Sequence, residues 1–273
     1  MIQRRQVGGR QGQLETSEAG VGAPAPALPV VFLHADSGRA SQWSAVQEAI
    51  STERRTAAFD FRGHGRSEPA RNEDYGFAGR VEDLLSVVDA LELRRFVVAA
   101  HSGGAAVALE AGAAQPERIA GLFLLDPPTD PRVMPEEVKS GMLQGLASPN
   151  SLEIQKQFYA TIAGSNASVR ERVLADCEAV NSAARLGVAR ALAQWNPEPC
   201  LKAWKGPIHV VGSQSNDNGH ALYDLRSDVP RTVVPSVGHW IQLDDPALVT
   251  RALRDFAALV EQAEVTGARV VQG

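Results

Sequence analysis

The stretch FVVAAHSGGAAVALE, residues 96–110, joins a short apolar run to an alanine-rich segment through small residues on either side of Ser102. The opening run is typical of a strand buried on both faces, and the closing segment is typical of a helix. A serine between the two must occupy a sharp, strained turn, so the residues two before and two after it must be small. Ala100 and Gly104 meet that requirement. The stretch therefore predicts Ser102 as a nucleophile raised above the edge of a sheet.

Similar apolar runs stand on both sides of this stretch and predict further strands of the same sheet. They cover residues 30–33, 56–59, 122–125, 208–211 and 231–234. Helical periodicity separates most of them, at residues 81–91 for example, and the last helix begins at Asp245-Pro246, an N-cap followed by proline. The first twenty residues resemble a polar hairpin around Gly8-Gly9. Alternation of strand and helix predicts an α/β fold with a mostly parallel sheet and helices on both faces.

One interval breaks the alternation. Residues 126–207 contain no strand pattern and read as several helices. The predicted organisation is a core domain formed by residues 1–126 and 207–273, with residues 127–206 inserted as a helical cap after the sixth strand.

Composition limits the classes of function. The 273 residues carry a net charge of −5 and a pI of about 5.7, which gives no indication of nucleic-acid binding. The N-terminus has no apolar run of a signal peptide, and no segment reaches the ~18 apolar residues of a membrane span. Two cysteines, Cys177 and Cys200, are too few for a disulfide framework and are expected to be reduced thiols. A cytoplasmic protein with no membrane or nucleic-acid partner is expected.

Five local features resemble the α/β-hydrolase superfamily along nearly the whole chain. They are His34-Ala35-Asp36-Ser37-Gly38, the segment DFRGHGRS at residues 60–67, the turn at Ser102, Leu125-Asp126-Pro127, and Gly238-His239-Trp240. The resemblance implies an α/β-hydrolase fold with a helical cap and an esterase-like or lactonase-like serine hydrolase. It also implies that His239, between a short strand and the last helix, is the base for Ser102, a role that suits the pKa of imidazole.

The acid that would orient His239 has two candidates in the chain order Ser, Asp, His. Asp126 ends the strand that follows the helix after Ser102, and some branches of the superfamily carry the acid at this place. Asp217 follows the next strand, the commoner location, but the usual spacing after Gly212 falls on Ser215. The sequence favours Asp126 and leaves Asp217 open.

The oxyanion hole is expected to use two backbone N–H groups, those of Gly103 and Asp36. A carboxylate at Asp36 departs from the superfamily pattern, because a negative charge inside the hole would oppose the oxyanion. Asp36 is therefore expected to turn away, toward Arg39, to be neutral, or to contact the substrate.

The segment at residues 60–67 is interpreted as structural, with Asp60 paired to Arg62. A metal site formed by Asp60, His34 and His64 matches no known ligand spacing. The three spaced glycines of a dinucleotide site are absent. Neither metal nor organic cofactor is expected.

The function predicted from these residues is hydrolysis of a small or medium ester or lactone through an acyl-enzyme on Ser102. Two alternatives remain. One is another reaction of the same scaffold, such as carbon–carbon bond hydrolysis, cofactor-free dioxygenation or haloperoxidation. The other is a non-catalytic ligand-binding protein. A homodimer is compatible with the sequence, which does not determine the oligomeric state.

Overall fold

The computed structural model describes residues 1–23, 27–216 and 219–266. Its centre is an eight-stranded sheet with the order β1-β2-β4-β3-β5-β6-β7-β8. The strands are β1 (Gln3–Gly8), β2 (Gln13–Ala19), β3 (Val30–Leu33), β4 (Thr56–Phe59), β5 (Phe96–His101), β6 (Ile119–Leu125), β7 (Ile208–Ser213) and β8 (Arg231–Val234). The pairs from β4 through β8 are parallel, whereas β1 and β2 form an antiparallel hairpin whose second strand pairs antiparallel with β4. The α/β-hydrolase fold predicted from the sequence is therefore confirmed.

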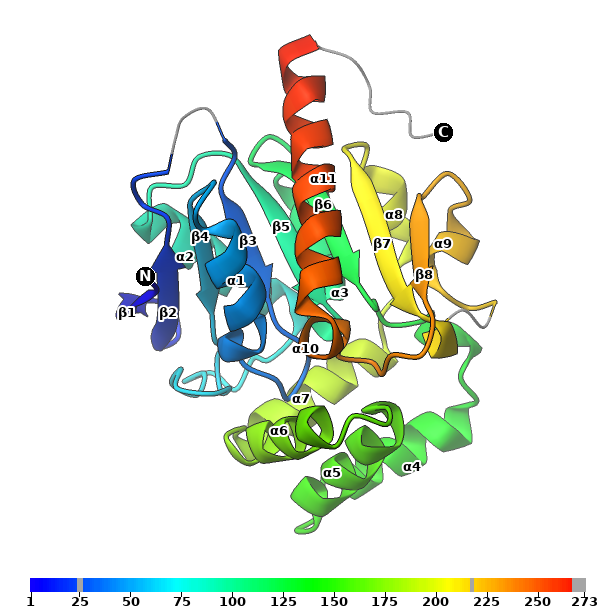
Figure 1. Cartoon of the computed structure of the whole chain (residues 1–273). Helices are drawn as coiled ribbons and strands as arrows, with labels where there is room; N and C mark the ends of the chain where they lie inside the picture. The colour runs from blue at the N-terminus through cyan, green and yellow to red at the C-terminus, as the bar shows by residue number, and fades with distance from the viewer. Residues whose placement is uncertain (24–26, 217–218, 267–273) are drawn as a thin grey trace.

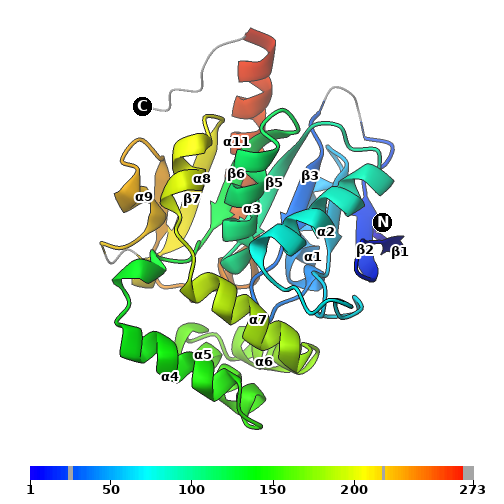
Figure 2. The same ribbon diagram turned by 180° about the vertical axis from the view of Figure 1, so that it is seen from behind.

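Helices cover both faces of the sheet, as the alternation predicted. One face carries α1 (Ser44–Ile50) and α11 (Pro246–Thr266) (Figure 1). The other carries α2 (Phe77–Ala90), α3 (Gly103–Ala114) and α8 (Glu198–Ala203) (Figure 2). The short helices α9 (Leu222–Leu225) and α10 (Ile241–Asp244) flank β8 in the sequence.

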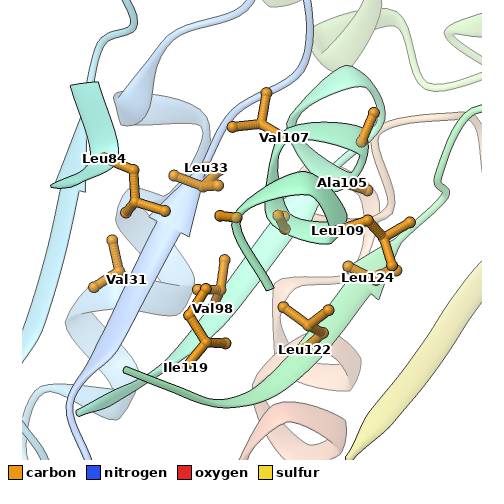
Figure 3. Packing of buried hydrophobic residues seen from close by; sticks show 14 of the residues in the cluster. Val31, Leu33, Leu84, Val98, Ala105, Val107, Leu109, Ile119, Leu122 and Leu124 are labelled. Atoms are coloured by element: carbon orange, nitrogen blue, oxygen red, sulfur yellow. The ribbon is translucent and has the colours of Figure 1, made fainter. Parts of the chain in front are cut away.

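Apolar side chains fill the space between these helices and the sheet. On the side of α2 and α3 the cluster includes Val31, Leu33, Leu84, Val98, Val107, Leu109, Leu122 and Leu124 (Figure 3). Each is at most 1% exposed. Burial of one such side chain stabilises the fold by about 1.5–3 kcal/mol. This packing gives the turn after β5 a rigid support.

Four helices follow one another between β6 and α8. They are α4 (Glu136–Leu146), α5 (Ser151–Ile162), α6 (Ala167–Glu178) and α7 (Ser182–Ala193). In both views they lie beyond the carboxyl ends of the central strands, with α7 nearest the sheet (Figures 1 and 2). The Asn181 side chain caps α7 by accepting the N–H groups of Ala183 and Ala184. The edge of the sheet where Ser102 stands is thus the edge that faces these helices.

Within the described ranges, no helix combines the length and the apolar character that crossing a membrane requires.

Candidate active site

Ser102 stands between the last residue of β5 and the first residue of α3 with φ 52° and ψ −125°. Its N–H donates to the carbonyl oxygen of Leu125 at 3.0 Å, which joins the turn to the end of β6. A Cβ built on Gly104 would lie 2.5 Å from the carbonyl oxygen of His34, so only glycine fits there. The strained backbone that the sequence predicted is present, and Ser102 is partly exposed.

His239 and Asp126 meet at the same edge of the sheet. The Nδ1 atom of His239 lies 2.6 Å from Oδ2 of Asp126. Burial alone would raise the pKa of Asp126, but the hydrogen bond and charge of His239, together with the N–H of Ser213, lower that pKa below its ordinary value. The carboxylate is therefore ionised at neutral pH and holds the proton of His239 on Nδ1.

Ser213 at the end of β7 fixes the other side of this carboxylate. Its N–H donates to Oδ1 of Asp126 at 2.7 Å, and its Oγ lies 3.0 Å from Oδ2. Asp126 itself has a φ of 41°, so the chain bends sharply as it leaves β6. Asp217, the other candidate acid, lies outside the described residues.

His101 connects the residue before Ser102 to the loop that carries His239. Its Nε2 donates to the carbonyl oxygen of His239 at 2.9 Å, and its Nδ1 accepts from Nε2 of Gln242 at 3.1 Å. Burial, followed by the charge of His239, lowers the pKa of His101 to about 3, so its ring is neutral. This role could not be predicted from the sequence, because the partner is a backbone carbonyl far along the chain.

The end of α5 also holds the His239 loop. The N–H of His239 donates to the carbonyl oxygen of Ile162 at 2.9 Å. Gly238 packs so closely on α5 that a Cβ there would lie 2.3 Å from the carbonyl oxygen of Ala163. The ring of Trp240, fully buried, meets Tyr159 of α5 edge-on at 5.0 Å. The helices between β6 and β7 therefore contribute to the position of His239.

Of the three possibilities that the sequence left open for Asp36, the turn toward Arg39 was wrong. Arg39 lies 3.5 Å from Asp176. The Asp36 carboxylate instead accepts from Nη1 of Arg80 at 2.6 Å and lies against Gly103, where a Cβ would be 2.4 Å from its atoms. Arg80 was not singled out in the sequence, since only the packing of α2 brings it to Asp36.

The predicted pair of Asp60 and Arg62 was also wrong. Asp60 accepts the N–H groups of Ala40 and Arg66, while the guanidinium of Arg62 pairs with Asp83 at 2.8 Å. The packing of α2 brings Asp83 to Arg62, while the N–H of Arg66 in the following turn and the N–H of Ala40 are directed at Asp60.

Backbone groups also engage both ring nitrogens of His34. Its Nδ1 lies 2.7 Å from the carbonyl oxygen of Ala35, and its Nε2 accepts from the N–H of Phe61 at 2.9 Å. Among the described residues, no three histidine, cysteine or acidic side chains converge as metal ligands would. His34 is thus a structural support for the loop that carries Asp36.

Comparison with curated sequences finds distant relatives. The chain is 26% identical over 245 residues to the dihydrolipoyllysine-residue acetyltransferase component of an acetoin cleaving system from Pseudomonas putida, covering 84% of this chain and 63% of that protein. It is 30% identical over 105 residues to a Klebsiella pneumoniae protein named as the carbamate hydrolase RutD, 38% of this chain and 40% of that protein. A Variovorax paradoxus protein of the same name is 25% identical over 257 residues, which cover 88% of this chain and 95% of that protein. The chain thus spans less than two thirds of the first two relatives.

Solved structures share the fold over nearly the whole chain. A thermophilic esterase from Thermogutta terrifontis, solved with malate bound, has a TM-score of 0.81 at 20% identity, covering 94% of this chain and 99% of that one. Est816, described as an N-acyl homoserine lactone degrading enzyme, has a TM-score of 0.74 at 25% identity, covering 92% and 100%.

The sequence model of the alpha/beta hydrolase family matches residues 30–252. That match includes the strained serine after β5, the acid after β6 and the histidine before α10. The chain belongs to the alpha/beta hydrolase family.

Proposed function

We propose that this hydrolase cleaves a small or medium ester or lactone through an acyl-enzyme on Ser102. The observation that carries the proposal is the 2.6 Å contact between Nδ1 of His239 and the buried carboxylate of Asp126. With the proton held on Nδ1, the lone pair of the imidazole is on Nε2. Nε2 would take the proton of the Ser102 hydroxyl as Oγ attacks the substrate carbonyl carbon.

The remaining steps use backbone groups and water. The N–H groups of Gly103 and Asp36 would donate to the oxyanion of the tetrahedral intermediate. His239 would then give its proton to the leaving alcohol oxygen, leaving an acyl group on Ser102. A water molecule, deprotonated by His239, would attack that ester. His239 would return this proton to Oγ of Ser102 as the bond to the acyl carbon breaks and the carboxylic acid is released. Asp126 would hold the imidazole in one tautomer throughout.

The substrate class follows from the helices beyond the strand ends. We infer that α4 to α7 form a cap over Ser102, within the predicted cap segment of residues 127–206. A cap would limit the acyl and alcohol groups to small or medium size and keep bulk water from the oxyanion. Relatives named as carbamate hydrolases, an esterase and a lactone-degrading enzyme support acyl transfer to water and make carbamates part of the test.

The test is a panel of p-nitrophenyl esters of increasing chain length, lactones and carbamates, measured with the wild-type protein and with Ser102→Ala. The wild-type protein is expected to turn over at least one neutral substrate, and Ser102→Ala is expected to lose that turnover. Ser86→Ala, on α2 and bonded to the carbonyl oxygen of Glu82, is the matched control and should keep it. A fluorophosphonate should label the wild-type protein and not Ser102→Ala.

A Ser102→Ala protein that keeps most of its turnover would contradict acyl-enzyme chemistry. Failure of the fluorophosphonate to label the folded wild-type protein would instead favour the non-catalytic binding alternative.

A further inference from the structure

A carboxylate lies beside one of the two proposed oxyanion donors. A Cβ built on Gly103 would be 2.4 Å from Cγ and from both carboxylate oxygens of Asp36. The Asp36 side chain is 14% exposed. Since the N–H groups of Gly103 and Asp36 are the proposed donors, a full negative charge stands within a few ångströms of the developing oxyanion. In a partly buried site such a charge would raise the barrier to attack.

Arg80 supplies the opposite charge. Its Nη1 donates to Oδ1 of Asp36 at 2.6 Å, and its side chain is 1% exposed. The guanidinium lies over the rings of Phe77 and Phe61, with Cζ 4.9 and 5.7 Å from the ring centroids. Contact with two aromatic rings and the rigid frame of α2 restrict where this cation can lie. The pair is thus held in one arrangement from outside the loop that carries Asp36.

The other polar groups near Asp36 do not take over this role. Burial lowers the pKa of His64 to about 4, so its buried ring is neutral. The hydroxyl of Tyr159 donates to the backbone carbonyl oxygen of Asp36 and not to its carboxylate. Arg39 on the same loop is directed to Asp176. Among the described residues, Arg80 is the cation in contact with this carboxylate.

We propose that Arg80 is a positioning residue for the proposed hydrolase reaction, one that compensates the charge of Asp36 at the oxyanion hole. The inference rests on the proposed function of Ser102. The pair keeps the Asp36 carboxylate bound to Arg80, so the backbone N–H groups of Gly103 and Asp36 dominate the electrostatic field at the oxyanion. Arg80 acts through Asp36 and does not itself touch the reacting atoms.

The test is a double-mutant cycle on the neutral ester that the wild-type protein turns over best. Arg80→Met leaves the carboxylate uncompensated, so kcat should fall by about tenfold to a hundredfold while KM changes little. Asp36→Asn keeps the backbone N–H and removes the charge that Arg80 compensates, so its kcat is the reference value of the cycle. The combination of Asp36→Asn with Arg80→Met should recover kcat nearly to the Asp36→Asn value.

Arg39→Met is the matched control, since it removes a cation from the same loop without affecting Asp36, and its kcat should be unchanged. If Arg80 served only to pack against Phe77, the second substitution would not restore kcat, and that result would overturn the inference. If Arg80→Met does not fold, Arg80→Lys and Arg80→Gln replace it. The inference then requires a several-fold higher kcat for the lysine variant, and equal kcat values would overturn it.

The two proposals fail differently. If Ser102→Ala loses turnover but Asp36→Asn does not rescue Arg80→Met, only the role of Arg80 is overturned. Retention of turnover in Ser102→Ala overturns the proposed function and the role of Arg80 with it.

Discussion

Asp126 is both buried and ionised. The buried charge is stable because each carboxylate oxygen accepts a hydrogen bond. The residue is 1% exposed, and its oxygens accept from Ser213 and from Nδ1 of His239. An amide of the same shape would preserve the packing but would offer an N–H toward the imidazole or force it into the other tautomer. The charge and the tautomer therefore depend on this one side chain.

Asp126→Asn is accordingly expected to fold and to lose kcat by roughly a thousandfold or more, as expected for a base held in the wrong tautomer. Steady-state kinetics on the best ester, with circular dichroism to verify folding, measures this. Asp130→Asn is the control, because Asp130 is a buried, hydrogen-bonded carboxylate of the same connection that pairs with Arg132. An Asp126→Asn protein with full activity, beside an inactive Asp217→Asn, would assign the acid to Asp217.

At the level of single residues, the sequence predicted the candidate catalytic side chains and missed the residues that contact and position them. Ser102 and His239 stand in recognisable local patterns, and chain order made Asp126 a candidate. Arg80 and Ser213 have no such pattern, because their roles depend on which element packs beside them. For Asp36 the sequence offered the nearby Arg39 as one of three possibilities, whereas in the fold its partner is Arg80, 44 positions along the chain.

Among the elements, the turn from β5 to α3 depends on the absence of a side chain at Gly104. A Cβ there would lie 2.5 Å from the carbonyl oxygen of His34 and 3.1 Å from that of Leu33, and both are backbone atoms. Gly104→Ala is therefore expected to destabilise the protein by about 1–3 kcal/mol and to lower kcat.

Urea denaturation measures the change in stability. Gly141→Ala, inside α4 with no atom within 4 Å of the new Cβ, is the matched control and should be neutral or stabilising by up to about 1 kcal/mol. A Gly104→Ala protein as stable and as active as wild type would show that the turn adapts.

The loop before α10 is expected to be equally sensitive to one methyl group. A Cβ on Gly238 would lie 2.3 Å from the carbonyl oxygen of Ala163, so Gly238→Ala must push the loop away from the end of α5. His239 is the next residue, and kcat should fall by about tenfold or more because a displaced base loses its alignment. Gly8→Ala, where nothing lies within 4 Å, should leave kcat unchanged. Steady-state kinetics measures both variants. Equal kcat values for Gly238→Ala and Gly8→Ala would show that the contact with α5 does not position His239.

The elements themselves were largely predictable from the sequence. The continuous apolar runs at residues 30–33 and 56–59 are β3 and β4 with the same limits, since strands buried on both faces need apolar residues throughout. Strand ends were less predictable: β6 begins at Ile119 and β7 continues to Ser213, because hydrogen bonds to neighbouring strands extend them beyond their apolar centres.

Across the whole molecule, three buried histidines make stability depend on pH. Burial is the first cause in each: it lowers the pKa of His101 to about 3, that of His64 to about 4, and that of His34 well below its ordinary value. The unfolded chain binds protons at these sites near pH 6.5, whereas the folded protein does not. Their contribution to stability is therefore complete above pH 6.5 and is lost as the pH falls toward the folded values.

The free energy of unfolding is expected to decrease by about 1.4 kcal/mol per histidine and pH unit below pH 6.5. Urea denaturation at pH 7.5 and pH 5 measures this. His101→Gln should reduce this pH dependence. Equal stability at the two pH values would mean that the buried rings are protonated in the folded protein.

The contacts that hold His239 join distant parts of the chain, 113 positions apart to Asp126 and 138 to His101. During synthesis on the ribosome, Ser102 and the strands around it emerge long before His239. A nascent chain can therefore assemble much of its central sheet before the proposed base is present, so the proposed hydrolysis would begin only after the segment around residue 239 has docked.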